Sequence, residues 1–101
     1  MTTWFVSRHP GAIAWARQNA VAADRWVEHF DPAWAQAGDT VIGTLPFDVA
    51  AAITEAGARF VALTLKLARE DRGKEINAQG MSQLDCRLVE YKVMRVGDYA
   101  P

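Results

Sequence analysis

Apolar and polar positions follow one another along the chain in short blocks that predict strands and helices in turn. The bulky run Trp4-Phe5-Val6 has high strand propensity and leads directly into the polar turn Ser7-Arg8-His9. Pro10-Gly11 then opens a helical pattern from Ala12 to about Ala20. The start of the chain therefore predicts a strand, a loop and a helix whose positive end faces the polar turn.

The next stretch predicts a second strand and a short helical turn. Arg25 to Phe30 alternates imperfectly between polar and apolar residues, and Asp31-Pro32 ends the pattern. Ala33 to Gln36 predicts a single helical turn before Gly38-Asp39.

A second strand, turn and helix follow in the middle of the chain. The β-branched run from Thr40 to Thr44 predicts a strand, and the alanine-rich segment from Phe47 to Ala56 predicts a helix. Pro46 suits the first helical position, and Gly57 suits the left-handed position just past the helix end.

The last third predicts two strands that enclose a charged loop and a helix. Phe60 to Leu65 is nearly all apolar, as in an inner parallel strand covered on both faces. Lys66 to Glu75 is dense in charge and predicts an exposed loop. Asn77 is positioned to cap a helix to about Cys86, and the alternation over Val89 to Val93 predicts an edge strand.

Strands that alternate with helices predict an α/β fold, a small Rossmann-like three-layer sandwich with a mostly parallel sheet of about five strands. In such sheets, ligands bind at the carboxyl ends of the strands. We expect that edge to hold Ser7 to His9, His29, Thr44 and the loop from Lys66 to Lys74.

Composition narrows the functional classes. With 101 residues, 50% of them hydrophobic, the chain fits a single domain over residues 1–101, and its small size favours a site shared across a homodimer. A formal net charge of -1 does not indicate binding to long nucleic acid. Cys86 is the only cysteine, and the sequence shows no targeting segment, membrane span or metal constellation. We expect a cytoplasmic protein that needs no cofactor.

The polar turn after the first strand carries the most informative chemistry. The guanidinium of Arg8 matches phosphate oxygens, and the helix start behind it adds backbone N–H donors. The imidazole of His9 can exchange a proton near neutral pH. The alternative for Arg8 is a surface ion pair, for example with Asp31.

Other candidates have stronger structural alternatives. His29 lies among apolar residues and is as well explained by a structural role, and Thr44 by plain helix capping. Arg72, next to Gly73, is the best ligand candidate in the charged loop, although a solvated charged face competes with this role. The tryptophans are better explained as core or interface residues, with Trp34 the one candidate for stacking on a base.

Four blocks of the sequence resemble a known family. They are Trp4 to Gly11 (WFVSRHPG), Gly38 to Pro46 (GDTVIGTLP), Gly57-Ala58-Arg59 and Arg72 to Glu75 (RGKE). On these blocks the chain resembles the small CRISPR-associated accessory proteins of the Csx type, which are encoded beside type III systems. The resemblance runs over nearly the whole chain, but the alanine-rich helix and the tail carry no such signature.

The resemblance implies a ring nuclease, a homodimer with a CARF-like fold that cuts cyclic oligoadenylate and so switches off the antiviral signal. It implies cyclic tetra-adenylate as the ligand and cleavage without a metal, which leaves a 2′,3′-cyclic phosphate. Carried onto this chain, it gives Ser7, Arg8 and His9 as the catalytic loop. Further ligand contacts are expected from Gly11, His29, Thr44, Arg72 and Lys74.

Two other functions remain as alternatives to this one, and a third resemblance ranks well below it. The chain can be a sensor or sponge that binds the ring without cutting it, or a protein that only docks onto a CRISPR effector. An arginine followed by a histidine after a strand also resembles the histidine phosphatases. Here Pro10 stands where those enzymes have glycine, and 101 residues leave no space for their second catalytic histidine region.

Overall fold

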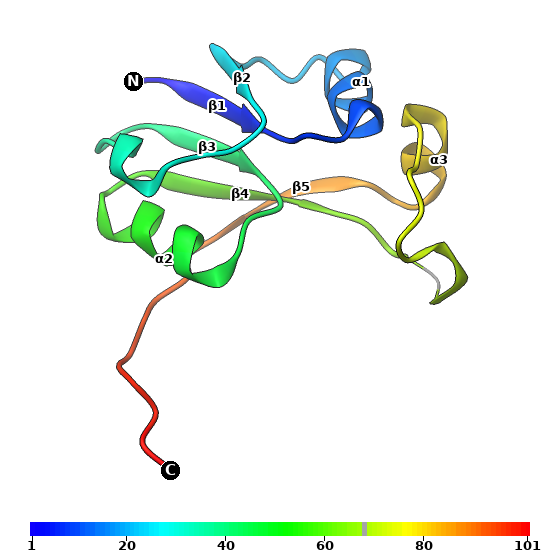
Figure 1. The fold of residues 1–101 in the computed structure, drawn as a ribbon. Helices are drawn as coiled ribbons and strands as arrows, with labels where there is room; N and C mark the ends of the chain where they lie inside the picture. The colour runs from blue at the N-terminus through cyan, green and yellow to red at the C-terminus, as the bar shows by residue number, and fades with distance from the viewer. Residues whose placement is uncertain (68) are drawn as a thin grey trace.

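The computed structural model describes residues 1–67 and 69–101 and contains a five-stranded sheet in the order β2-β1-β3-β4-β5 (Figure 1). The strands are β1 (Thr3–Val6), β2 (Arg25–Val27), β3 (Thr40–Gly43), β4 (Arg59–Thr64) and β5 (Arg87–Tyr91). β1 to β4 run parallel, and β5 pairs antiparallel with β4 at one edge. This topology confirms the predicted Rossmann-like α/β fold.

Helices cover both faces of the sheet and make the fold a three-layer sandwich. They are α1 (Pro10–Gln18), α2 (Phe47–Glu55) and α3 (Ala78–Gln83), with 3-10 turns η1 (Pro32–Trp34) and η2 (Arg69–Asp71). α1 and α3 lie side by side on one face, and α2 lies on the other (Figure 1).

Alternation within the strands divides the core between the two faces. Trp4, Val6 and Val41 pack in the cluster with α2 residues such as Ile53. Phe5 and Ile42, one position on, pack in the cluster that includes residues of α1 and α3. Successive strand residues point to opposite faces, so β1 and β3 are buried on both sides.

The two main helices differ from their predicted boundaries by one or two residues. α1 begins at Pro10 instead of Ala12, because the fixed φ of proline suits the first helical turn, and it ends at Gln18. Ala20 has a φ of 56°, a left-handed conformation that does not continue a helix. α2 starts at Phe47 as predicted, but Pro46 is its N-cap residue and not its first helical residue. Gly57, with a φ of +83°, confirms the predicted left-handed position.

Three later boundaries were also predicted too long or out of register. β2 ends at Val27 instead of Phe30, because the side chain of Phe30 turns into the core. α3 ends at Gln83 instead of Cys86, since Asp85 has a φ of 55°. The last strand covers Arg87–Tyr91 and not Val89 to Val93, and the Val93 N–H donates to the Thr54 hydroxyl of α2.

β4 was expected to be buried on both faces. It has a neighbour on each side, as an inner strand should, but Phe60 is the one buried residue of the strand, and Val61 to Thr64 are half-buried. The carboxyl half of β4 leads into the open cavity described below, and Leu63 lines that cavity.

The C-terminal residues after β5 run away from the sheet (Figure 1) and expose Met94, Val96 and Tyr99. No helix among the described residues has the length and apolar character needed to cross a membrane.

Candidate functional site

All four parallel strands end at one cavity of about 680 Å³. Residues that follow each strand line it: Ser7, Arg8 and His9 after β1, Glu28 and His29 after β2, Thr44 and Leu45 after β3, and Leu65 after β4. The chain leaves β1 toward β2 on one side and returns to β3 on the other, so the topological switch point of the sheet lies between β1 and β3. Open α/β sheets bind ligands at this place.

The lining of the cavity combines polar and apolar side chains. The polar group is Ser7, Arg8, His9, Glu28, His29, Thr44, Lys74 and Glu75. The apolar group includes Val6, Phe30, Leu45, Val49, Leu63, Leu65, Leu67 and Met81. A cavity lined in this way suits a ligand that carries both anionic groups and flat or apolar parts.

The turn after β1 is held by its own backbone and side chains. The Ser7 hydroxyl accepts the His9 backbone N–H at 3.1 Å, and the His9 carbonyl accepts the N–H groups of Ala12 and Ile13 in α1. His9 is the N-cap residue of α1, directly before Pro10. Its backbone is therefore fixed while its ring stays exposed at the cavity.

His9 contacts Glu75, a residue that the sequence did not single out for chemistry. Ring nitrogen Nδ1 lies 2.9 Å from one carboxylate oxygen of Glu75 and 3.2 Å from the other. The two residues are 66 positions apart in the sequence, so no local spacing pairs them. The available signal was weak: Glu75 closes the RGKE block of the charged loop.

Gly11, expected as a ligand contact, has a packing role. A Cβ atom on Gly11 would lie 1.7 Å from the carbonyl oxygen of Ile76, so the chain after Glu75 crosses α1 where only glycine leaves room. Gly11 also lines a shallower hollow next to the main cavity, together with Arg8, His9 and Glu75.

Arg8 is exposed at the cavity. Within residues 1–67 and 69–101, no carboxylate forms an ion pair with its guanidinium. Asp31, the alternative partner considered from the sequence, instead caps η1 by accepting the Ala33 backbone N–H at 2.9 Å. The Arg8 guanidinium is thus available to an anion in the cavity.

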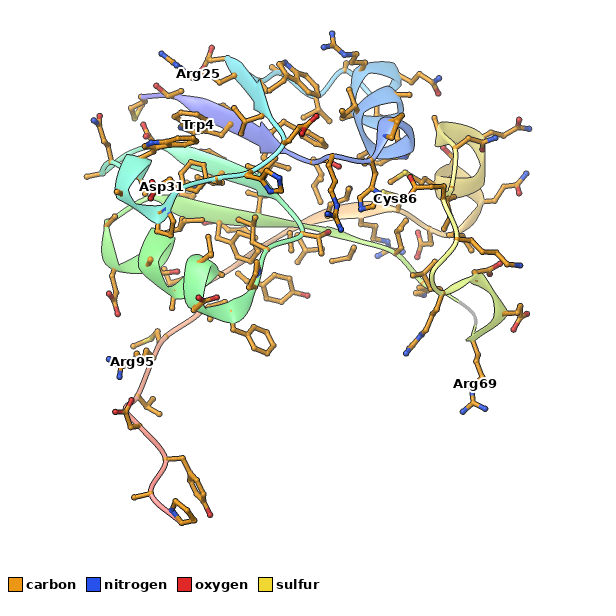
Figure 2. The ribbon with its side chains drawn as sticks, viewed as in Figure 1. Trp4, Arg25, Asp31, Arg69, Cys86 and Arg95 are labelled. Carbon is orange, nitrogen blue, oxygen red and sulfur yellow. The ribbon has the colours of Figure 1, made fainter. Side chains whose placement is uncertain are left out.

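The remaining predicted ligand residues divide into two groups. His29, Thr44 and Lys74 line the cavity, whereas Arg72 is exposed outside its lining. The Thr44 hydroxyl donates to the Leu63 carbonyl at 3.0 Å, and so it ties β3 to β4 and does not cap α2. Figure 2 shows Arg69, in the same charged loop as Arg72, pointing away from the sheet.

The tryptophan considered for base stacking belongs to an aromatic cluster. Trp34 stacks on Trp4 with ring centroids 5.6 Å apart, and it meets Phe30 edge-on. On the same cluster, the guanidinium of Arg25 lies 5.3 Å from the Trp4 ring centroid (Figure 2). Trp34 therefore packs against Trp4 and Phe30, while 46% of its surface is exposed.

Cys86 is a poor candidate for nucleophilic chemistry. Burial, together with the neighbouring Asp85 carboxylate, raises the pKa of the Cys86 thiol to about 11. The thiol stays protonated near neutral pH and is a poor nucleophile. Among the residues that the structure describes, no three His, Cys, Asp or Glu side chains gather where they could hold a metal ion.

Comparison with known proteins supplies a family. Residues 4–94 match the family model described as Putative CRISPR-associated protein (Cas_VVA1548). Neither the curated proteins nor the solved structures gave a match to the chain. The match runs from Trp4 in β1 to beyond β5, and it includes every residue that lines the cavity. The chain belongs to this CRISPR-associated family.

Proposed function

We propose that the chain is a ring nuclease that opens cyclic oligoadenylate without a metal and so switches off type III CRISPR signalling. The observation that carries the proposal is the arrangement of Ser7, Arg8 and His9 at a cavity on the carboxyl edge of the sheet. Membership in a CRISPR-associated family supports the biological setting. Cyclic tetra-adenylate is the ring that we expect as substrate.

The side chains at the cavity suit cleavage of a phosphodiester by its own ribose. The 2′-oxygen attacks the adjacent phosphorus, the bond from phosphorus to the 5′-oxygen breaks, and the products are a 2′,3′-cyclic phosphate and a 5′-hydroxyl. His9 serves the proton transfer, as base toward the 2′-hydroxyl or as acid toward the leaving oxygen. Arg8 stabilises the charge on the equatorial phosphate oxygens, and Ser7 orients the turn.

Size and symmetry favour a dimer. A cavity of about 680 Å³ suits a drug-sized molecule, whereas a ring of several nucleotides is larger. Two copies related by a two-fold axis would present two such cavities to one symmetric ring. Sedimentation of the protein with and without the ring measures this, and a monomer in both states would contradict it.

The enzyme assay uses the full chain and purified cyclic tetra-adenylate in excess EDTA. We expect linear products ending in a 2′,3′-cyclic phosphate, identified by mass. If the ring stays intact but remains bound to the protein, the protein is a sensor or sponge and not an enzyme. An intact ring that never binds would favour a protein that docks onto a CRISPR effector.

A further inference from the structure

The contact between His9 and Glu75 joins the turn after β1 to the charged loop before α3. Both carboxylate oxygens of Glu75 lie within hydrogen-bond distance of the same ring nitrogen, Nδ1, at 2.9 and 3.2 Å. The proposed chemistry of Arg8 and His9 does not by itself require this contact. The contact points to a role for Glu75, which was not among the predicted site residues.

The chemistry of the two groups determines where the imidazole proton lies. An ionised carboxylate only accepts hydrogen bonds, so Nδ1 must donate and carry the proton. In a neutral imidazole, Nε2 is then the nitrogen with a free lone pair. We propose that Glu75 is a positioning residue, which holds His9 in the tautomer and orientation that leave Nε2 free to exchange a proton with the ligand. This inference rests on the proposed function, because it names the group that prepares His9 for its step.

Both partners are held by the backbone on either side of the contact. His9 is fixed by the Ser7 hydroxyl and by the start of α1. Glu75 directly precedes Ile76, whose carbonyl packs against Gly11, and Asn77 caps α3 by accepting the Gly80 N–H at 2.8 Å. The tertiary packing of α1 against α3 therefore sets the distance between the two side chains.

The location of the pair fits a role toward a ligand better than a role in stability. The side chains of His9 and Glu75 are 53% and 68% exposed, and exposed pairs contribute little to folding. Both residues line the main cavity and the adjoining hollow, each time together with Arg8. A phosphate bound by Arg8 would thus lie close to the imidazole ring that Glu75 orients.

The first test needs no substrate. Nitrogen-15 NMR of the ligand-free protein, at a pH where imidazole is neutral, reports which ring nitrogen of His9 carries the proton. The chain has two histidines, so His9→Asn identifies the His9 signals. We expect the Nδ1–H tautomer in the wild type and its loss in Glu75→Ala. A wild-type protein with the Nε2–H tautomer, or a tautomer unchanged by Glu75→Ala, would overturn the inference.

The second test uses cleavage of cyclic tetra-adenylate. We expect Glu75→Gln to lower kcat by about 10- to 100-fold with KM within about twofold, and Glu75→Asp to restore part of kcat. Glu70→Gln is the matched control, because Glu70 is exposed in η2 and lies outside the cavity lining.

A double variant separates positioning from structural damage. In the His9→Ala background, Glu75→Gln should have no further effect on kcat, because a positioning residue acts only through the group it orients. An additional loss as large as in the wild type would refute positioning. If the wild type leaves the ring intact, the proposed function fails, while the NMR experiment still decides the role of Glu75.

Discussion

The two strand-turn-helix units on either side of the switch point have the same architecture and different chemistry. β1 leads through Ser7, Arg8 and His9 into α1, and β3 leads through Thr44 and Leu45 into α2. Both turns end at a proline and line the same cavity. The first presents an available guanidinium and imidazole, whereas the second presents an apolar side chain and a hydroxyl that donates to Leu63.

The residue after each proline shows what distinguishes the two units. Gly11 lies beneath the Ile76 carbonyl, where the chain crosses α1. Phe47, which follows Pro46 as the first residue of α2, is 85% exposed. The crossing segment brings Glu75 within hydrogen-bond distance of His9 in the first turn, and it brings Lys74 into the lining of the same cavity. The turn after β1 therefore gains a side-chain partner for His9 from a distant part of the chain.

Removal of the imidazole is the strongest test of this difference. We expect His9→Ala to slow cleavage of cyclic tetra-adenylate by about 100-fold or more, since general acid–base catalysis contributes about 10²- to 10⁴-fold. Binding of the ring, measured by calorimetry, should change little. Wild-type kinetics in His9→Ala would show that another residue transfers the proton.

Removal of the Arg8 guanidinium should weaken binding of the ring. A hydrogen bond to a charged group contributes about 1.5 to 3 kcal/mol, so Arg8→Ala should weaken binding of the ring by about 10- to 100-fold. Arg72→Ala is the matched control, because Arg72 is exposed outside the cavity lining. A larger loss of affinity in Arg72→Ala than in Arg8→Ala would mean that the loop, and not the turn after β1, grips the phosphate.

The close approach at Gly11 can be tested by thermal or urea unfolding. Gly11→Ala places a methyl group against the Ile76 carbonyl, and overpacking of this kind costs about 1 to 3 kcal/mol. Phe47→Ala, at the exposed counterpart, should change the free energy of unfolding by less than about 0.5 kcal/mol. Equal effects of the two substitutions would remove the contrast between the helix starts.

Loss of the Thr44 hydroxyl in the second turn should lower stability and hardly change activity. Thr44→Val removes the hydrogen bond to the Leu63 carbonyl, which we expect to lower the free energy of unfolding by about 1 kcal/mol. Cleavage by the folded variant should stay within about twofold of the wild type. A large loss of cleavage with unchanged stability would instead give the Thr44 hydroxyl a direct role at the ligand.

The order of strands and helices was predictable because hydrophobic periodicity is a local property. The boundaries of these strands and helices were less predictable. The strand predicted over Arg25 to Phe30 ends at Val27, because the side chain of Phe30 packs in the core against Trp4. The local sequence pattern does not predict this contact. The helix expected to reach Cys86 ends at Gln83, and two residues later Asp85 adopts a left-handed conformation that does not continue a helix.

The candidate site was predictable in part for the same reason. Ser7, Arg8 and His9 stand together in the sequence, and the rule that ligands bind at carboxyl ends of parallel strands assigned them to an edge. That His29, Thr44 and Lys74 line the same cavity and Arg72 does not depends on how the loops fold over that edge.

By itself, the sequence determined the α/β class and the segment in which an arginine and a histidine follow a buried strand, since both are properties of neighbouring residues. Only the tertiary structure decided that Glu75 meets His9 across 66 positions and that Gly11 is needed where Ile76 crosses α1. Such contacts depend on the packing of α1 against α3, and packing is a property of the whole fold.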